Sequence, residues 1–191
     1  MEVVRAALRG GAPAVQVRAK TETARETVEL ARVLREETRV VGALLFVNDR
    51  VDVALVAGAD GAHLGDDDLP LAAARAVVPS GFLLGRSADT TEQALRAREE
   101  GADYVGVGPV YATATKADAG SPIGLSRISA VAAVVGIPVV GIGGIEASNA
   151  AEVVRAGAAG VAVIRAVMAA PDPEEVVRRF LRSVDAGLEL R

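Results

Sequence analysis

The stretch Gly101-Ala102-Asp103-Tyr104-Val105-Gly106-Val107-Gly108, or GADYVGVG, contains the pattern that decides the fold. Gly101 is typical of a residue that ends a helix, and the short apolar run 104–108 is typical of a buried parallel strand. Polar residues follow within 111–116. Six more apolar runs end in the same way, at 14–17, 44–47, 61–65, 82–86, 139–142 and 161–164. Polar residues at the carboxyl ends of successive buried strands converge over one mouth of a β/α barrel, so the sequence predicts this fold.

Helical segments separate the apolar runs. Apolar residues recur at helical spacing within 21–39, and we expect further helices over 89–100, from 147 or 148 to 156, and over 173–184. The segment 89–100 opens on a capping-type Asp-Thr-Thr-Glu. The segment 3–10 predicts a first helix with no strand before it, which leaves seven strands where a closed barrel has eight. We therefore predict an α/β fold, a TIM-type (β/α)8 barrel lacking its first strand.

Two explanations of the missing strand stay open. Either the barrel is open, or the start site is placed too late and the natural protein carries about 10 to 20 further residues. In the second case this form of 191 residues is expected to be less stable, to associate through its sheet edges and to be less active. The intact mass of the native protein would test this explanation.

Length and composition limit the function classes. A chain of 191 residues, 51% of them hydrophobic, predicts one domain over residues 1–191. A net charge of −4, without a basic patch that includes aromatic residues, argues against a nucleic-acid partner. The apolar stretches are too short to span a bilayer and no signal peptide is recognised, so the cytoplasm is the default location. The absence of cysteine excludes disulfides and thiolate metal sites.

Two lysines stand out among the 21 basic residues, since all the others are arginine. Lys20 and Lys116 each follow a predicted strand, where a compact ammonium group could be required. Gln16, Arg18 and Lys20 share one strand face because residues two apart point to the same side. An amide, a guanidinium and an ammonium group together predict an anion clamp. The alternative is an outward-facing strand with solvated ends.

Carboxylates follow the next two strands. Asp49 and the run Asp66-Asp67-Asp68 stand at neighbouring strand ends, an arrangement that suits Mg²⁺ held partly by a substrate phosphate. Asp68 also stands just before Leu69-Pro70, where an aspartate often caps a helix, and this is the competing interpretation. Asn48 is expected to orient substrate or to complete a turn.

The loops after the later strands have the chemistry of a phosphate site. Thr113, Thr115 and Lys116 supply hydroxyl and ammonium groups, and Gly143-Gly144 lets backbone N–H groups approach a ligand. The recurrent phosphate site of these barrels follows the last two strands, which end here at Gly143-Gly144 and at Ile164-Arg165.

The sequence shows no nucleophilic side chain with an evident activating partner. His63, the one histidine, lies within a predicted strand, and we expect a packed or hydrogen-bonded core residue rather than a catalytic one. No Cys and no Ser–His pair is evident for nucleophilic attack. Cations and Mg²⁺ gathered around an anionic substrate would instead stabilise charge on a departing group.

The spaced motifs resemble thiamine-phosphate synthase over nearly the whole chain. The resemblance rests on QVRAK (16–20), NDR (48–50), HLGDDD (63–68), GPVYATATK (108–116) and GIGGI (141–145). It implies a transferase that joins hydroxymethylpyrimidine diphosphate to thiazole phosphate, releases pyrophosphate and forms thiamine phosphate. It also implies a dissociative departure of pyrophosphate, followed by capture of the pyrimidine cation by the thiazole nitrogen.

The resemblance divides the expected site residues into three groups. The pyrimidine diphosphate would be held by Gln16, Arg18, Lys20, Asn48, Ser87 and Lys116, of which Arg18, Lys20, Ser87 and Lys116 are expected to be catalytic. The cofactor Mg²⁺ would be bound by Asp49 and Asp68. The thiazole phosphate would be held by Thr113, Thr115, Gly144, Ile164 and Arg165.

Three departures from the family pattern are present. The family usually has Gln at Asp66 and Ser at Arg165, and it begins with a strand that ends in a Thr-Asp or similar pair. An isomerase like the thiazole tautomerases and a non-catalytic ligand-binding barrel stay open as alternatives, as does a homo-oligomer. A tautomerase would need a proton shuttle. The acidic pair Asp49 and Asp68, together with Lys116, favours the synthase instead.

Overall fold

The computed structural model describes residues 1–113 and 121–191. The strands of this part are β1 (Ala14–Val17), β2 (Leu44–Asn48), β3 (Gly61–Leu64), β4 (Leu83–Ser87), β5 (Tyr104–Val107), β6 (Val139–Ile142) and β7 (Gly160–Ala162). Its helices are α1 (Glu2–Arg9), α2 (Ala24–Val41), α3 (Val51–Ala57), α4 (Leu71–Val77), α5 (Thr91–Glu99), α6 (Gly124–Val135), α7 (Ala150–Arg155), α8 (Arg165–Met168) and α9 (Pro173–Glu189). Among these described residues, none of the helices has the length and apolar character that crossing a membrane requires.

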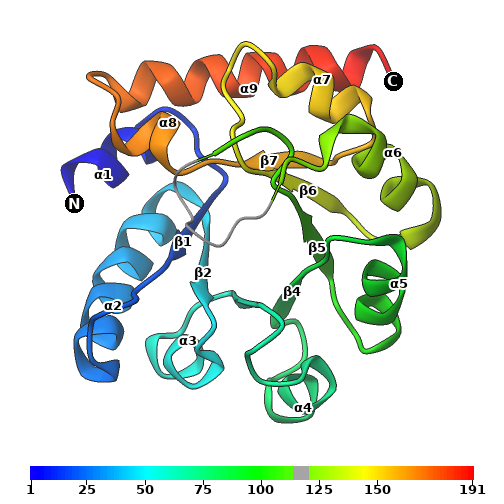
Figure 1. Ribbon diagram of the computed structural model, residues 1–191. Coiled ribbons are helices and arrows are strands. Elements are labelled where there is room, and N and C mark those ends of the chain that lie inside the picture. The colour runs from blue at the N-terminus through cyan, green and yellow to red at the C-terminus, as the bar shows by residue number, and fades with distance from the viewer. Residues whose placement is uncertain (114–120) are drawn as a thin grey trace.

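The strands form one curled parallel sheet in chain order, and the helices cover its outer side (Figure 1). Within the described residues no strand closes the ring between β7 and β1, and α1, α8 and α9 pack together on that side. The prediction of a TIM-type barrel that lacks its first strand is therefore confirmed. Arg9 holds α1 against α9, since its Nε donates to Glu174 Oε2 at 2.9 Å.

The two faces of the sheet differ in composition. Val17, Val47, Ala62, Leu84 and Val105 belong to the outer face and are buried in the core beneath the helices. The inner face instead combines polar residues, glycines and two aromatic rings. The glycines leave room on this face for the larger side chains of the neighbouring strands.

Two aromatic rings meet inside the sheet. The rings of Phe46 on β2 and Tyr104 on β5 pack edge to face, with centroids 5.6 Å apart. Gly61 and Gly85 make this possible: an added Cβ at Gly61 would lie 2.6 Å from the Phe46 ring, and one at Gly85 would lie 2.1 Å from Cζ of Tyr104. A side chain at either glycine would therefore displace a ring.

Two Gly-Ala-Asp segments fasten the amino ends of the strands. Asp60 Oδ2 accepts hydrogen bonds from Leu45 N and from Arg35 Nη1, both at 2.7 Å. Asp103 repeats the arrangement, because its Oδ2 accepts from Leu84 N at 2.7 Å and from Arg75 Nη2 at 2.5 Å. Asp60 thus ties the start of β3 to β2 and α2, and Asp103 ties the start of β5 to β4 and α4.

Helix boundaries differ from the sequence prediction at the start of α5 and at the end of α9. The capping box of α5 is formed by Thr90 and Gln93, one residue later than the predicted Asp89 and Glu92, because the helix begins at Thr91. Helix α9 continues to Glu189, five residues beyond the predicted end at Val184, and the prediction was wrong there.

Replacing Asp103 should destabilise the fold without changing the site. In Asp103→Ala the Leu84 N–H and the Arg75 guanidinium lose a shared acceptor, so we expect a loss of about 1 to 2 kcal/mol in the free energy of unfolding. Asp185→Ala, at an exposed position of α9, is the control and should change it by less than about 0.5 kcal/mol. Denaturant unfolding of the two variants measures both values, and equal effects would show that the Asp103 contacts contribute nothing.

Candidate active site

The candidate site lies at the carboxyl ends of the strands. All the strands are parallel, so their last residues and the loops that follow meet at one end of the barrel. A cavity of about 330 Å³ lies at the opposite end, where Leu44 and Leu83 begin β2 and β4. It contains none of the predicted site residues, and β/α barrels act at the carboxyl end, so we do not place the site there.

The predicted anion clamp follows β1. Gln16 pairs in register with Phe46, which places it on the inner face of the sheet. Arg18 and Lys20 continue the alternation beyond the end of the strand, and all three side chains are exposed, whereas Val17 between them is buried. The structure therefore presents an amide and two cations at the carboxyl end of β1.

Asn48 and Asp49 end β2 in an unusual conformation. Asp49 has φ +67°, the one positive φ among the described residues other than glycine. Its N–H donates to the carbonyl of His63 at 2.8 Å, and Asn48 Nδ2 donates to Asp49 Oδ1. Such backbone strain persists only where surrounding contacts hold it, and it is frequent at functional sites. These contacts hold the Asp49 carboxylate next to the end of β3.

The acidic run after β3 forms a closed loop. Asp68 Oδ2 accepts a hydrogen bond from Gly65 N at 2.6 Å. Helix α4 has Pro70 at its N-cap and no side-chain cap, so the interpretation of Asp68 as a helix cap is wrong. Arg86 fixes the same loop, because its guanidinium donates to the Gly65 carbonyl at 2.5 Å and pairs with Asp66 at 2.9 Å. The extra charge of Asp66 is thereby compensated.

The two predicted metal ligands supply a partial coordination shell. Across residues 1–113 and 121–191, no group of three or more His, Cys, Asp or Glu side chains is placed to hold a metal ion. Asp49 and Asp68 are each oriented by a hydrogen bond within the loops at the carboxyl ends of β2 and β3. Their chemistry fits Mg²⁺, which usually takes one or two carboxylates and completes its shell with water and phosphate oxygens.

A polar chain of three side chains crosses the inner face. The hydroxyl of Tyr104 lies 3.1 Å from His63 Nδ1, and His63 Nε2 lies 3.0 Å from Ser87 Oγ. Burial raises the pKa of the Tyr104 hydroxyl far above its usual range, so this group stays protonated. His63 is hydrogen-bonded as expected. Sequence reasoning did not foresee the contact between His63 and Ser87, because the two residues are 24 apart along the chain and the β3–β4 pairing brings them together.

The predicted phosphate loops pack against each other. Gly143 and Gly144 have φ +96° and +64°, and the N–H of Tyr111 donates to the Gly143 carbonyl at 3.0 Å. An added Cβ at Gly144 would lie 2.6 Å from the carbonyl oxygen of Ala112. The glycine pair thus lets β6 approach the loop that leads to Thr113.

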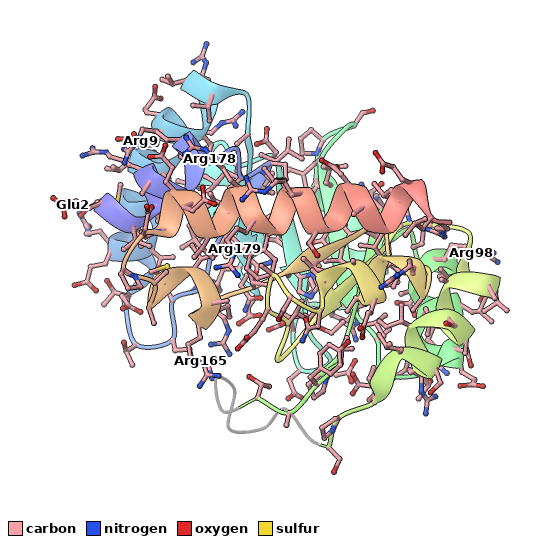
Figure 2. All side chains as sticks on the ribbon, turned by 90° about the horizontal axis from the view of Figure 1, so that it is seen from above. Glu2, Arg9, Arg98, Arg165, Arg178 and Arg179 are labelled. Carbon is pink, nitrogen blue, oxygen red and sulfur yellow. The ribbon has the colours of Figure 1, made fainter. Side chains whose placement is uncertain are left out.

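The remaining predicted residues fall into two groups. Ile164 and Arg165 begin α8 with exposed side chains, and Figure 2 shows Arg165 projecting from the edge of the molecule, away from α9. Arg165 forms no ion pair with any described residue. Thr115 and Lys116 lie outside the described residues.

Comparison with known proteins identifies the family. A family model described as thiamine monophosphate synthase matches residues 1–167. This chain belongs to the thiamine monophosphate synthase family. A thiamine-phosphate synthase from Moorella thermoacetica is 54% identical over 180 residues, 94% of this chain and 86% of that protein. One from Natronomonas pharaonis is 52% identical over 186 residues, 96% of this chain and 87% of that protein.

A solved structure of the same family agrees with the fold. Thiamine phosphate pyrophosphorylase from Pyrococcus furiosus is 44% identical, with a TM-score of 0.91 over 98% of this chain and 90% of that chain. The resemblance inferred from the five sequence motifs is therefore confirmed. Synthases at this level of identity favour the synthase over the tautomerase and the non-catalytic barrel.

Sequence reasoning missed Tyr104 and Arg86 as contributors to the site. Tyr104 was part of the quoted strand but carried no signal of its own. Arg86 lies between Gly85 and Ser87 in β4. Because successive strand residues point to opposite faces, the sequence could have placed Arg86 on the outer face. Its contact with the acidic loop depends on the β3–β4 register, which the sequence does not state.

Proposed function

We propose that this chain joins hydroxymethylpyrimidine diphosphate to thiazole phosphate and releases thiamine phosphate and pyrophosphate. The observation that carries the proposal is its similarity to synthases over more than nine-tenths of the chain. Oriented carboxylates and exposed cations at one end of the sheet support it, because both substrates are anionic phosphate compounds.

The reaction needs a charged leaving group to be stabilised. The bond between the pyrimidine methylene carbon and the diphosphate oxygen breaks, and the electron pair leaves with pyrophosphate. Arg18, Lys20 and Lys116 are proposed to bind the diphosphate oxygens as negative charge develops on them. The lone pair of the thiazole nitrogen then forms the new C–N bond with the resonance-stabilised cation.

Asp49 and Asp68 are proposed to hold Mg²⁺ against the diphosphate. The bound ion would supply positive charge to the departing oxygens. Gln16, Asn48 and Ser87 are proposed to orient the pyrimidine. Gln16 and Asn48 are supported by their in-register partners Phe46 and His63, which place both side chains on the inner face.

The thiazole phosphate is proposed to bind at the other side of the mouth. Thr113, Thr115, Gly144 and the pair Ile164-Arg165 would surround its phosphate. Arg165 has no ion pair among the described residues, so its guanidinium is available to an anion, which supports a direct contribution where the family usually has serine.

An assay with both precursors tests the proposed function. Purified protein, Mg²⁺, hydroxymethylpyrimidine diphosphate and thiazole phosphate should yield thiamine phosphate and pyrophosphate in equal amounts, and omission of either precursor should abolish the product. Failure to form thiamine phosphate, together with tautomerisation of a thiazole substrate, would replace the synthase with an isomerase.

Removing the Asp68 charge should impair the reaction more than the fold. In Asp68→Asn the amide oxygen can still accept from Gly65 N, so the melting temperature should change little. Turnover should fall at least about tenfold and need more Mg²⁺, because one charged ligand is lost. Asp67→Asn, at an exposed neighbouring position, is the matched control. Full activity and an unchanged Mg²⁺ dependence of Asp68→Asn would exclude a metal role.

Adding a side chain at Gly144 should affect one substrate. In Gly144→Ala the new Cβ would meet Ala112 and push the 111–113 loop away, so binding of thiazole phosphate should weaken about tenfold while the pyrimidine diphosphate binds normally. Gly42→Ala is the control, with a similar φ of +73° and no atom near the new Cβ. Calorimetry with each substrate separately measures both affinities, and equal losses would contradict the division of the site.

A further inference from the structure

A hydrogen-bonded chain of side chains joins Ser87, a proposed site residue, to His63 and Tyr104, to which the proposed function assigns no role. Its members come from β5, β3 and β4 and all belong to the inner face. His63 Nδ1 faces the Tyr104 hydroxyl at 3.1 Å, and His63 Nε2 faces Ser87 Oγ at 3.0 Å. Both ring nitrogens of the one histidine are therefore engaged by hydroxyl groups.

Gly85 and Gly106 make room for this hydrogen-bonded chain of side chains. His63, Gly85 and Tyr104 are in register across β3, β4 and β5, so the absent side chain of Gly85 lets the flanking rings meet. An added Cβ there would lie 2.4 Å from the Tyr104 hydroxyl oxygen. Gly106 pairs with Ser87, and a Cβ at this glycine would lie 3.0 Å from His63 Cε1. The sheet therefore leaves space for these three side chains to touch.

The direction of the first hydrogen bond follows from the surroundings of Tyr104. Its hydroxyl has no second hydrogen-bond partner among the described residues, so donation to Nδ1 is the arrangement that satisfies its hydrogen. Burial raises the pKa of Tyr104 and keeps this hydrogen in place. In its neutral form, His63 would then accept at Nδ1 and carry its own proton at Nε2, because a neutral imidazole has one donor and one acceptor nitrogen.

The second hydrogen bond sets the role of Ser87. With the proton on Nε2, His63 donates to Ser87 Oγ and cannot remove the serine proton. We propose that Tyr104 and His63 are positioning residues that fix the Ser87 hydroxyl as a hydrogen-bond donor toward an acceptor atom of the pyrimidine substrate. The substrate part of this inference rests on the proposed function.

This arrangement is the inverse of a nucleophilic serine site. In a Ser–His–Asp triad, the carboxylate accepts from Nδ1–H and leaves Nε2 bare to receive the serine proton. Here a hydroxyl donor occupies the place of the carboxylate, which selects the opposite tautomer. Ser87 can orient a substrate through its hydrogen, and the same contact prevents its activation for attack.

Nitrogen NMR of His63 tests the tautomer without any assay. Because the chain has one histidine, ¹⁵N-histidine labelling gives a single imidazole. Near neutral pH we expect protonated Nε2 and unprotonated Nδ1. Tyr104→Phe, with thermal unfolding as the check on folding, should yield a mixture of tautomers. Tyr111→Phe, which removes the hydroxyl of the other tyrosine, should leave the spectrum unchanged.

Three results would overturn the inference. They are a proton on Nδ1, a doubly protonated ring in the unaltered protein, or a spectrum of folded Tyr104→Phe identical to that of the unaltered protein. The result for the unaltered protein decides the tautomer even if the variant does not fold. It is also independent of thiamine phosphate formation, so failure of the proposed function would be distinguished from failure of this inference.

A double-mutant cycle tests the consequence for substrate. Tyr104→Phe should lower kcat about tenfold, as expected when the donor is no longer held toward the substrate. Ser87→Ala should lower it at least as much, and adding Tyr104→Phe to Ser87→Ala should have no further effect. Independent losses that multiply in the double variant would show that Tyr104 does not act through Ser87.

Discussion

The contact of side chains across Gly85 is the constraint on which the inner face of this sheet depends. Because the strands are parallel and paired in register, His63 and Tyr104 flank a residue without a side chain. The centroids of the two rings are 5.5 Å apart, and the Tyr104 ring occupies the space that a Cβ at this position would fill. The same contact joins β3 to β5 across β4, and Ser87 lies on the same face of β4, two residues beyond Gly85.

The two ends of the barrel carry different kinds of contact. At the amino ends, Asp60 and Asp103 tie strands and helices together through backbone N–H groups. At the carboxyl ends lie the predicted site residues that the structure describes, among them Gln16, Asn48 and Ser87. Asp49 is held by Asn48 and by the His63 carbonyl, and Asp68 is held by the N–H of Gly65.

The sequence predicted the parts that depend on local pattern. The seven strands, the missing closing strand and the family followed from short apolar runs and from the motifs after them. The sequence could not reveal the Ser87–His63 contact or the hold of Arg86 on the acidic loop, since both arise from strand register. The cap of α5 was misplaced because Asp89-Thr90-Thr91 offers adjacent residues with similar capping propensity, and tertiary packing chooses among them.

We propose that the mouth has two anion-binding halves. Residues after β1 to β4, together with Lys116, bind the diphosphate, and the other predicted residues after β5 to β7 bind the thiazole phosphate. A crystal structure with Mg²⁺, pyrophosphate and thiamine phosphate tests it most directly. The account predicts pyrophosphate on Arg18 and Lys20, with the metal on Asp49 and Asp68, and the phosphate of thiamine phosphate at Gly144. Pyrophosphate at Gly144, or a metal that contacts neither aspartate, would contradict it.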